Sequence, residues 1–307
     1  MKTRKLTIKS LLVTVLALLA CDPEYPTPYA TNEYNSATGN AGIMFTNASP
    51  NSTTLSLAVD NIELETTEVA FGVKFPATTG YSSTIPAGSR NIRLLAPDGT
   101  SLGSVRSTIN ANSTSSYFGI GRADVTLAAR ADRARLIEFL AESLPAVPTS
   151  TPNTAHVRLL NFGLTTAPVA PATSGGTLGS IVLRIDATSP TPAPTIPVVT
   201  PASTGTYFLP SDQVFPIPAP VDGTVPDLRS LPKSYASTTS PFTALTVPTV
   251  GGAGNSYVVD VVTSSNGNIV LDDVALNLVA GRVYTLALIG SSVGGEGPYQ
   301  VLVIRHR

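Results

Sequence analysis

The stretch TLSLAVD, residues 54–60, decides the fold class of this chain. Its large apolar residues Leu55, Leu57 and Val59 alternate with a serine and an alanine, so every second side chain is bulky and apolar. A period of two is typical of a β-strand that turns one face to a core and the other to solvent. The stretch SIVLRID, residues 180–186, repeats the pattern. Both stretches are predicted to be half-buried strands.

The composition of the whole chain points to the same fold class. Of the 307 residues only 13% are charged, and the chain contains 24 glycines and 26 prolines. Valine and threonine favour strands, whereas glycine, proline and serine favour the turns between strands. The sequence therefore predicts an all-β fold with many short strands.

The two halves of the chain carry the same landmarks in the same order. These are an asparagine that ends an opening strand, the glycine of a tight hairpin turn, a tyrosine in a closing strand and the glycine that ends that strand. They are Asn47, Gly99, Tyr117 and Gly121 in the first half, and Asn161, Gly267, Tyr284 and Gly290 in the second. The turn glycines follow Asp and Asn, the residues that tight hairpin turns prefer. The nearly equal spacings, 18 residues from Gly99 to Tyr117 and 17 from Gly267 to Tyr284, indicate an internal duplication.

The landmarks resemble those of a known bacterial family. IMFTNASPNSTTLSLAVDN (43–61) and YSSTIPAGSRNIRL (81–94) in the first half resemble the DUF4397 domain, as do AHVRLLNF (155–162) and LVAGRVYTLALIG (278–290) in the second. The second half lacks the Ala-Ser-Pro turn and has Phe-Gly-Leu after its opening asparagine. The resemblance implies two tandem β-sandwich domains of immunoglobulin-like type on an exported protein. It supplies no catalytic residues.

The predicted domain organisation follows from these landmarks. It comprises a signal peptide (1–20), a lipidated cysteine with a flexible tether (21–41), a first sandwich (42–144), a linker (145–154) and a second sandwich (155–307). The second sandwich carries an insertion at about residues 186–250, which holds 13 of the 26 prolines. Proline lacks the backbone donor of a sheet ladder, so the insertion is predicted to be an excursion beside the sandwich rather than central sheet.

One segment fits two types of secondary structure. In residues 124–144, Leu136, Phe139 and Leu140 recur at helical spacing among charged residues. The same segment also fits a loop over residues 128–133 followed by a strand over 135–139. The family resemblance favours the strand, which would close the first sandwich.

The only cysteine of the chain, Cys21, lies at the end of an apolar run. Four basic residues and the run LLVTVLALLA precede it, and the acidic, proline-broken segment DPEYP follows it. A basic segment, a short apolar run and a small residue before the cysteine are typical of a secretory signal. The ending LLAC resembles the bacterial lipobox, which implies cleavage before Cys21, a diacylglyceryl group on its sulfur and an acylated amino terminus. An ordinary cleaved signal that leaves a free thiol is the alternative.

Charge and cysteine content restrict the partners and cofactors. Removal of residues 1–20 takes away four of the 19 basic residues and none of the 20 acidic ones, which leaves a net charge of −5. This charge argues against nucleic acid as a partner. A lone cysteine permits neither an internal disulfide nor a thiolate zinc site, and the sequence predicts no cofactor. We expect the membrane to be a partner through the lipid at Cys21.

Five aromatic residues of the insertion form a candidate contact surface for a partner: Tyr207, Phe208, Phe215, Tyr235 and Phe242. The alternative, that they pack the insertion onto its own domain, is favoured. Exposed tyrosines such as Tyr207 and Tyr235 are also the best candidates for sugar stacking, because the chain contains no tryptophan.

Residues with catalytic potential are few. His156 and His306 are the only histidines, and two Gly-x-Ser-x-Gly matches place Ser101 and Ser292 at their centres. A hydrolase needs this serine on a turn from a strand to a helix, with a histidine within hydrogen-bond reach. Both matches are predicted to lie beside strands instead, so the sequence predicts no catalytic residues.

Asp272 and Asp273 are the candidate metal ligands that we considered and set aside. Adjacent residues of a strand point to opposite faces, so the two carboxylates are expected to diverge. The pair also lacks the ligand spacing and central glycine of a calcium loop. A solvated turn without a metal is predicted.

The functional expectation is a non-enzymatic lipoprotein of the cell envelope, attached to the outer membrane and facing the periplasm or the cell surface. Asp22 and Glu24 resemble the acidic signal that follows the cysteine in surface lipoproteins of Bacteroidetes type, although Asp22 is also compatible with inner-membrane retention. A structural or interaction role in adhesion or surface assembly is predicted, with an envelope protein or a glycan as partner. The alternative is a carbohydrate-binding accessory protein of a glycan-uptake system.

Overall fold

The computed structural model is all-β, as the sequence predicts. It describes residues 39–60, 62–64, 68–78, 80–125, 132–140, 144, 154–165, 178, 181–185, 207–210, 234–236, 242–246, 255–263 and 267–306. Within these residues the chain forms strands β1 to β19 and no helix. The strands make up four sheets.

The first sandwich is made of eleven strands. They are β1 (Asn40–Asn47), β2 (Thr54–Val59), β3 (Ile62–Glu63), β4 (Val69–Ala70), β5 (Lys74–Phe75), β6 (Ser82–Pro86), β7 (Gly88–Leu95), β8 (Ser101–Ile109), β9 (Thr114–Ile120), β10 (Arg135–Leu140) and β14 (Ser234–Ala236). Its inner sheet has the order β14-β10-β9-β1-β5, with β6 also paired to β1, and its outer sheet has the order β3-β2-β7-β8, with β4 paired to β2. Buried side chains such as Phe45, Leu57 and Tyr117 fill the space between the two sheets.

The second sandwich is made of eight strands. They are β11 (Thr154–Asn161), β12 (Ile181–Ile185), β13 (Tyr207–Pro210), β15 (Thr243–Thr246), β16 (Asn255–Thr263), β17 (Ile269–Leu278), β18 (Val283–Ile289) and β19 (Gln300–Arg305). Its inner sheet has the order β15-β11-β18-β19 and its outer sheet the order β13-β12-β16-β17. Leu159, Leu183, Tyr257 and Leu286 are among the residues of its core.

The main strands of the two sandwiches follow the same topology. In each, the opening strand pairs in parallel with the closing strand, β1 with β9 and β11 with β18. Asn47 lies opposite Gly119, and Asn161 lies opposite Leu288. This register makes Tyr117 equivalent to Leu286, so the alignment of Tyr117 with Tyr284 is wrong by two residues. A shift of two keeps the same face of the strand, which is why both tyrosines still lie in a core.

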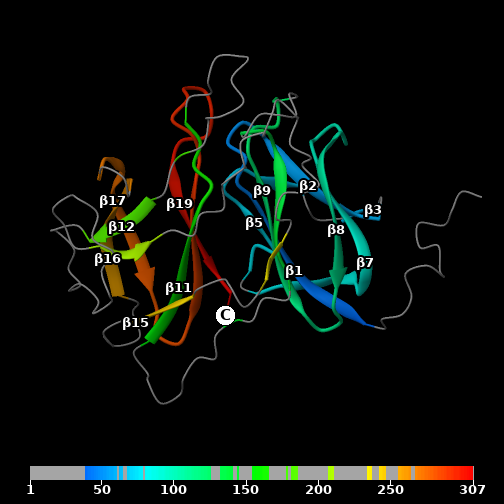
Figure 1. Ribbon diagram of the computed structural model, residues 1–307, viewed down its shortest axis with the longest axis horizontal. Helices are drawn as coiled ribbons and strands as arrows, with labels where there is room; N and C mark the ends of the chain where they lie inside the picture. The colour runs from blue at the N-terminus through cyan, green and yellow to red at the C-terminus, as the bar shows by residue number, and fades with distance from the viewer. Residues whose placement is uncertain are drawn as a thin grey trace, which may run out of the picture.

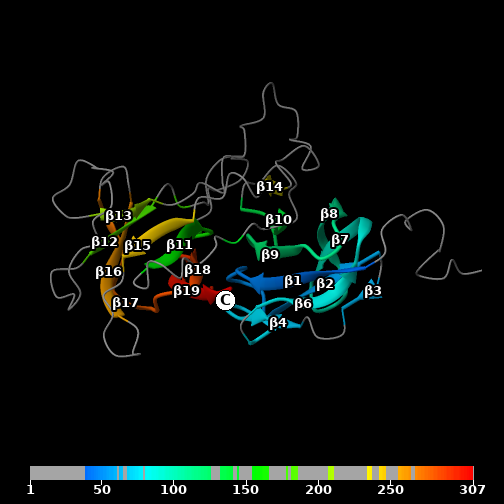
Figure 2. The same cartoon turned by 90° about the horizontal axis from the view of Figure 1, so that it is seen from below.

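The two inner sheets pack against each other, so the molecule is a stack of four sheets (Figures 1 and 2). One apolar cluster, which we call the junction core, contains buried residues of both sandwiches. They are Met44, Ala48, Phe118, Ile120, Ile137 and Phe139 of the first, and Leu160, Phe162, Ala287, Ile289 and Ile304 of the second. The ring centroids of Phe118 and Phe162 are 5.0 Å apart across the junction. The inner sheets are therefore covered on both faces.

Because the inner sheets are covered on both faces, their strands are more deeply buried than strands with one face in solvent. The strands β9, β11 and β18 are buried along almost their whole length, because alternate side chains enter a sandwich core and the junction core. The prediction that residues 54–60 form a half-buried strand is also wrong: Ser56 and Ala58 are buried. Ala58 lies between Glu63 and Arg93 on the neighbouring strands, and these longer side chains flank its small one.

The segment that fitted both a helix and a strand is a strand. Residues Arg135–Leu140 form β10, which pairs with β9 in the first inner sheet. Three short strands come from residues 186–250, and each lies at an end of its sheet: β13, β14 and β15. The prediction that this proline-rich segment is not central sheet is thus confirmed for these strands. Figure 2 shows β14 beside β10, in the sheet of the other sandwich.

Candidate functional site at the junction of the two sandwiches

The asparagine that ends each opening strand organises the turn that follows it. The Asn47 Oδ1 accepts a hydrogen bond from the Ser49 amide at 3.0 Å, and the Asn161 Oδ1 accepts one from the Gly163 amide at 3.0 Å. The Asn47 Nδ2 also donates to the Val69 carbonyl at 2.8 Å. Both asparagines therefore make the same side-chain turn, which is a structural role.

The glycine that ends each closing strand permits a close backbone approach at the rim of the junction. Gly121 has a φ of 82° and Gly290 a φ of 105°, a region that favours glycine. A Cβ atom at Gly121 would overlap the Arg133 carbonyl, and one at Gly290 would overlap the Pro298 carbonyl. The residues directly after these glycines, Arg122 and Ser291, therefore occupy equivalent positions.

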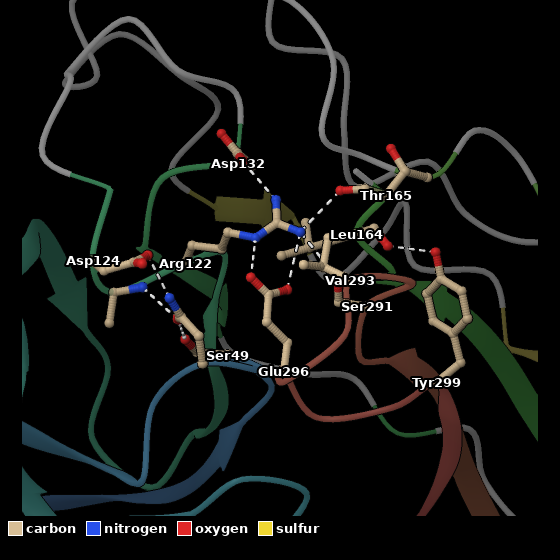
Figure 3. A network of polar contacts seen from close by, with 12 residues as sticks. Ser49, Arg122, Asp124, Asp132, Leu164, Thr165, Ser291, Val293, Glu296 and Tyr299 are labelled. Atoms are coloured by element: carbon tan, nitrogen blue, oxygen red, sulfur yellow. Dashed lines mark hydrogen bonds and ion pairs between the residues drawn. The ribbon is translucent and has the colours of Figure 1, made fainter. Parts of the chain in front are cut away.

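Arg122 is the centre of a buried polar network that joins the two sandwiches (Figure 3). Its Nε donates to the Glu296 Oε1 at 2.6 Å, and its Nη2 donates to the Glu296 Oε2 at 3.0 Å. Its Nη1 donates to the Asp132 Oδ2 at 2.6 Å. The Nη2 also donates to the Ser291 Oγ and to the Thr165 carbonyl, both at 2.9 Å. Asp132 belongs to the first sandwich and the other three partners belong to the second, so one side chain holds both.

The electrostatics of this network keep the guanidinium charged. Burial acts to lower the pKa of Arg122, but the carboxylates of Glu296 and Asp132 outweigh it and raise that pKa. The nearby Tyr299 hydroxyl donates to the Leu164 carbonyl, and burial raises the pKa of this tyrosine. One guanidinium and two carboxylates form a hydrogen-bonded ion cluster, the arrangement that makes a buried charge tolerable.

Backbone contacts extend the junction beside Arg122. The turn after Asn47 contains the Ala-Ser-Pro sequence, and its Pro50 carbonyl accepts a hydrogen bond from the Gly297 amide of the second sandwich at 2.7 Å. Within the first sandwich, the Asn51 side chain holds this turn: it accepts from the Ala123 amide at 2.8 Å and donates to the Asp124 carboxylate. The Ala-Ser-Pro turn of the first half therefore docks onto the second half.

A second polar group lies elsewhere in the junction, around His306. The Tyr81 hydroxyl, from the first sandwich, is 2.7 Å from the His306 Nδ1, and the Thr285 Oγ1 is 2.7 Å from its Nε2. The Arg158 Nε donates to the same Thr285 Oγ1 at 2.7 Å. The Arg158 guanidinium lies 4.4 Å from the ring centroid of Phe139, across the junction. The Nδ1 of His306 is thus engaged across the junction, while its Nε2 is held by Thr285 of the same sandwich.

The four residues considered as hydrolase components lie in different parts of the fold. Ser101 and Ser292 are both exposed, and Ser101 begins β8, directly after a hairpin turn. His306 is buried, with its nitrogens bonded to Tyr81 and Thr285. His156 lies within β11, between Ala244 of β15 and Val283 of β18. The Arg122 Nη2 donates to Ser291, the neighbour of the motif's central residue Ser292.

Asp272 and Asp273 differ from the prediction. They lie within β17 rather than in a turn, and their carboxylates converge with that of Asp260 instead of diverging. The three ligand atoms lie within 4.8 Å of one another. The cause is an irregular register between β16 and β17, where Asp273 takes a φ of 54° and no longer alternates with its neighbour.

This acidic group is the candidate cation site among the residues that the structure describes. Asp260 is buried, and its Oδ2 accepts hydrogen bonds from the Arg184 Nε at 3.0 Å and from the Arg184 Nη2 at 2.5 Å. A cation bound here would compete with that guanidinium for the same carboxylate. Arg184 therefore compensates the charge of the buried Asp260, and the cluster by itself is not evidence for a metal.

The aromatic residues of the insertion lie in different places. Tyr207 and Phe208 belong to β13, and Tyr235 belongs to β14, where it lies opposite Phe139. The ring of Phe242 is 5.8 Å from that of His306 and 4.7 Å from the Arg158 guanidinium, so it packs onto its own domain, as the favoured alternative predicts. Phe215 lies outside the described residues, as do Cys21, the predicted signal peptide and residues 21–38 of the predicted tether.

Sequence reasoning missed Arg122, the central residue of the site. A usable signal was present, because Arg122 follows the glycine of the first closing strand as Ser291 follows that of the second. Two polar residues at equivalent positions, each just beyond a buried strand, mark where the duplicated halves meet.

No helix among the described residues has the length and apolar character needed to cross a bilayer. Neither the models of known protein families nor the curated proteins include a match to this chain.

Proposed function

We propose that this protein is a non-enzymatic lipoprotein of the bacterial cell envelope with a structural or interaction role. The observation that carries the proposal is the junction: the junction core and the Arg122 network join two sandwiches into one body. A lipid on Cys21 would attach this body to the outer membrane through the predicted tether. Adhesion or surface assembly needs a stable surface held away from a membrane, and a four-sheet stack provides one.

The chemistry of the junction supports a structural rather than a catalytic role. The polar side chains of the site donate to or accept from one another: Arg122 with Glu296 and Asp132, and His306 with Tyr81 and Thr285. A catalytic group must keep a donor, an acceptor or an electron pair available to a substrate. These groups instead satisfy each other at a buried interface, which favours a role in holding the molecule together.

The anchor is tested by metabolic labelling with a palmitate analogue in a bacterial host that processes lipoproteins. The full chain should incorporate the label and remain with the membrane fraction, because several acyl chains anchor a protein far more tightly than one. The Cys21→Ser chain should incorporate no label. The matched control is Asp22→Asn, which alters the neighbouring residue but keeps the sulfur. Labelling of Cys21→Ser, or its absence from the parent chain, would refute the lipoprotein proposal.

The location and partner class are tested on intact cells. Digestion of the protein by an added protease places it on the cell surface, whereas protection until the outer membrane is opened places it in the periplasm.

A glycan array probed with the purified chain then separates the two partner classes, an envelope protein and a glycan. Sugar-dependent binding that Tyr207→Ala or Tyr235→Ala abolishes would replace the structural role with the carbohydrate-binding one.

A further inference from the structure

The side of the second sandwich formed by β17 and β19 is more open than the equivalent side of the first. Val301 lies opposite Leu288 as Leu136 lies opposite Gly119, which makes Val303 equivalent to Glu138. Glu138 is 1% exposed, whereas Val303 is 38% exposed. An apolar side chain therefore faces solvent in the second half where the first half buries its counterpart.

The facing strand shows the same difference. Gly103 of β8 lies opposite Leu94, and the equivalent position of β17 is Leu271, opposite Val261. A Cβ atom at Gly103 would lie 3.6 Å from the Arg135 Cα, so β8 closely approaches the start of β10. Leu271 and Val274 are only half-buried, although both pack against the core of the second sandwich. Together with Val301 and Val303 they form an apolar side that we call the β19 edge.

In the first sandwich another strand covers the equivalent edge. The strand β14 pairs in parallel with β10, so that Ser234, Tyr235 and Ala236 lie opposite Glu138, Phe139 and Leu140 (Figure 2). Within the described part of the chain, β19 pairs with β18 alone. Its central residues are VLVI, without the lysine, proline or inward charge that normally protects a sheet edge. The fold thus has a position for one more strand, and among the described residues this position is filled in the first sandwich only.

We propose that the β19 edge binds a second copy of this chain, by antiparallel pairing of two β19 strands about a two-fold axis. Residues directly opposite in such a pair lie on the same face of the sheet. A pair centred on Val303 places the two Val303 side chains side by side. Each apolar edge then covers the other. The inner sheet of the second sandwich in one copy thereby continues into the same sheet of the other copy.

The charges and the other face of β19 fit this occupant. In the register centred on Val303, each Arg305 lies opposite Val301 of the second copy, so the two Arg305 residues are about 13 Å apart along the strands. This separation exceeds the screening length of about 8 Å at physiological salt, so repulsion between them is weak. The opposite face of β19 contributes Ile304 to the junction core, with Leu302 packed against it. The edge is therefore continuous with an established interface and is held rigidly.

Sedimentation velocity over a range of concentrations tests the proposal without involving the lipid. The sample is the full chain with Cys21→Ser, which should show a reversible monomer–dimer equilibrium. In that background Val303→Lys should weaken dimerisation at least tenfold, because it places two ammonium groups side by side. The control Val73→Lys changes another exposed valine, 46% exposed, and should leave the equilibrium unchanged. A strictly monomeric parent chain, or equal dissociation constants for the parent and Val303→Lys, would overturn the proposal.

A cysteine scan tests the register. In the Cys21→Ser background Val303→Cys becomes the sole cysteine, and mild oxidation should give a disulfide-linked dimer, since directly opposite strand residues lie within the Cα separation that a disulfide requires. Thr108→Cys, at an exposed position of β8, should stay monomeric under the same conditions. Equal cross-linking of the two variants would contradict pairing at the β19 edge. Thermal unfolding of each variant verifies that it is folded.

Discussion

At the scale of single residues, Arg122 joins the two sandwiches through a buried ion cluster. Its guanidinium makes hydrogen bonds to two carboxylates, one from each sandwich, and its side chain is 4% exposed. Removing one partner of a buried ion pair is costly because the other charge stays buried without compensation. Loss of Arg122 would therefore leave the carboxylates of Asp132 and Glu296 without a cation and destabilise the junction.

Substitution of Arg122 by methionine tests this coupling. We expect Arg122→Met to lower the free energy of unfolding by about 3–5 kcal/mol, since both carboxylates lose their cationic partner. Urea denaturation followed by circular dichroism measures the change. The control is Arg106→Met, which removes an exposed arginine that donates to Ser89 at 3.2 Å and should cost less than about 1 kcal/mol. Similar losses of unfolding free energy for the two variants would show that the ion pairs of Arg122 do not stabilise the junction.

Buried tyrosines make the stability sensitive to alkaline pH. Burial raises the pKa of Tyr117, and the nearby Glu138 carboxylate raises it further. In the unfolded chain a tyrosine loses its proton near pH 10, while the native state keeps it, so the unfolded state binds fewer protons and stability falls as the pH rises above about 10. Below that pH both states keep the proton and the contribution is constant.

Tyr117→Phe removes this proton and isolates its effect. Between pH 10 and 12 we expect the variant to lose stability less steeply than the parent chain, by up to about 1.4 kcal/mol per pH unit. Denaturation curves recorded across this range give the two slopes. Tyr34→Phe, in the predicted tether, is the control and should keep the parent slope. Identical slopes for the parent chain and Tyr117→Phe would mean that Tyr117 ionises alike in the folded and unfolded states.

Sequence reasoning at this scale succeeded where a residue acts on its near neighbours. Asn47 and Asn161 were predicted as landmarks, and each bonds the amide two residues further on. Arg122 was missed because its partner Glu296 is 174 residues away in the chain. The convergence of Asp272 and Asp273 was missed because a positive φ in a strand depends on the register with its neighbour.

At the scale of elements, the end of each closing strand fixes how the halves meet. Gly290 follows β18 and lets the chain pass against the carbonyl of Pro298, next to Ser291 and its hydrogen bond from Arg122. We expect Gly290→Ala to cost at least about 2 kcal/mol, since the new Cβ overlaps that carbonyl and φ is 105°. Gly294→Ala is the matched control, because a Cβ there meets nothing within 4 Å.

Thermal unfolding of both glycine variants measures this prediction. The melting temperature of Gly290→Ala should fall by several degrees, whereas that of Gly294→Ala should stay near the parent value or rise slightly, as the unfolded chain loses conformational freedom. An unchanged melting temperature for Gly290→Ala would mean that the strand end tolerates a shift of the Pro298 segment.

The elements were predictable to the extent that their signals are local. Alternation in residues 54–60 and 180–186 identified the strands β2 and β12, and the hairpin glycines identified the turns that precede β8 and β17. Burial of β9, β11 and β18 on both faces was not predictable, because it arises from the second sandwich packing on the first. The same holds for β14, whose pairing with β10 joins residues about a hundred positions apart.

At the scale of the whole molecule, we expect the junction core to make the two sandwiches unfold as one unit. Phe118 is fully buried between Phe139 of its own sandwich and Phe162 of the other, with ring centroids 5.8 Å and 5.0 Å away. If either sandwich unfolds, these rings and the Arg122 network become exposed on the remaining one. That cost couples the two unfolding steps, so the parent chain should show a single transition in calorimetry.

Phe118→Ala and Phe45→Ala distinguish this coupling from a simple loss of stability. Each removes a fully buried phenylalanine and should cost about 3–5 kcal/mol. Phe45 lies in the core of the first sandwich, away from the junction core, so Phe45→Ala should lower the melting temperature but keep one transition. Phe118→Ala weakens the junction core itself, so its transition should broaden or split as the two sandwiches begin to unfold separately. Two transitions already in the parent chain would mean that the sandwiches are independent and that the junction contributes little to their stability.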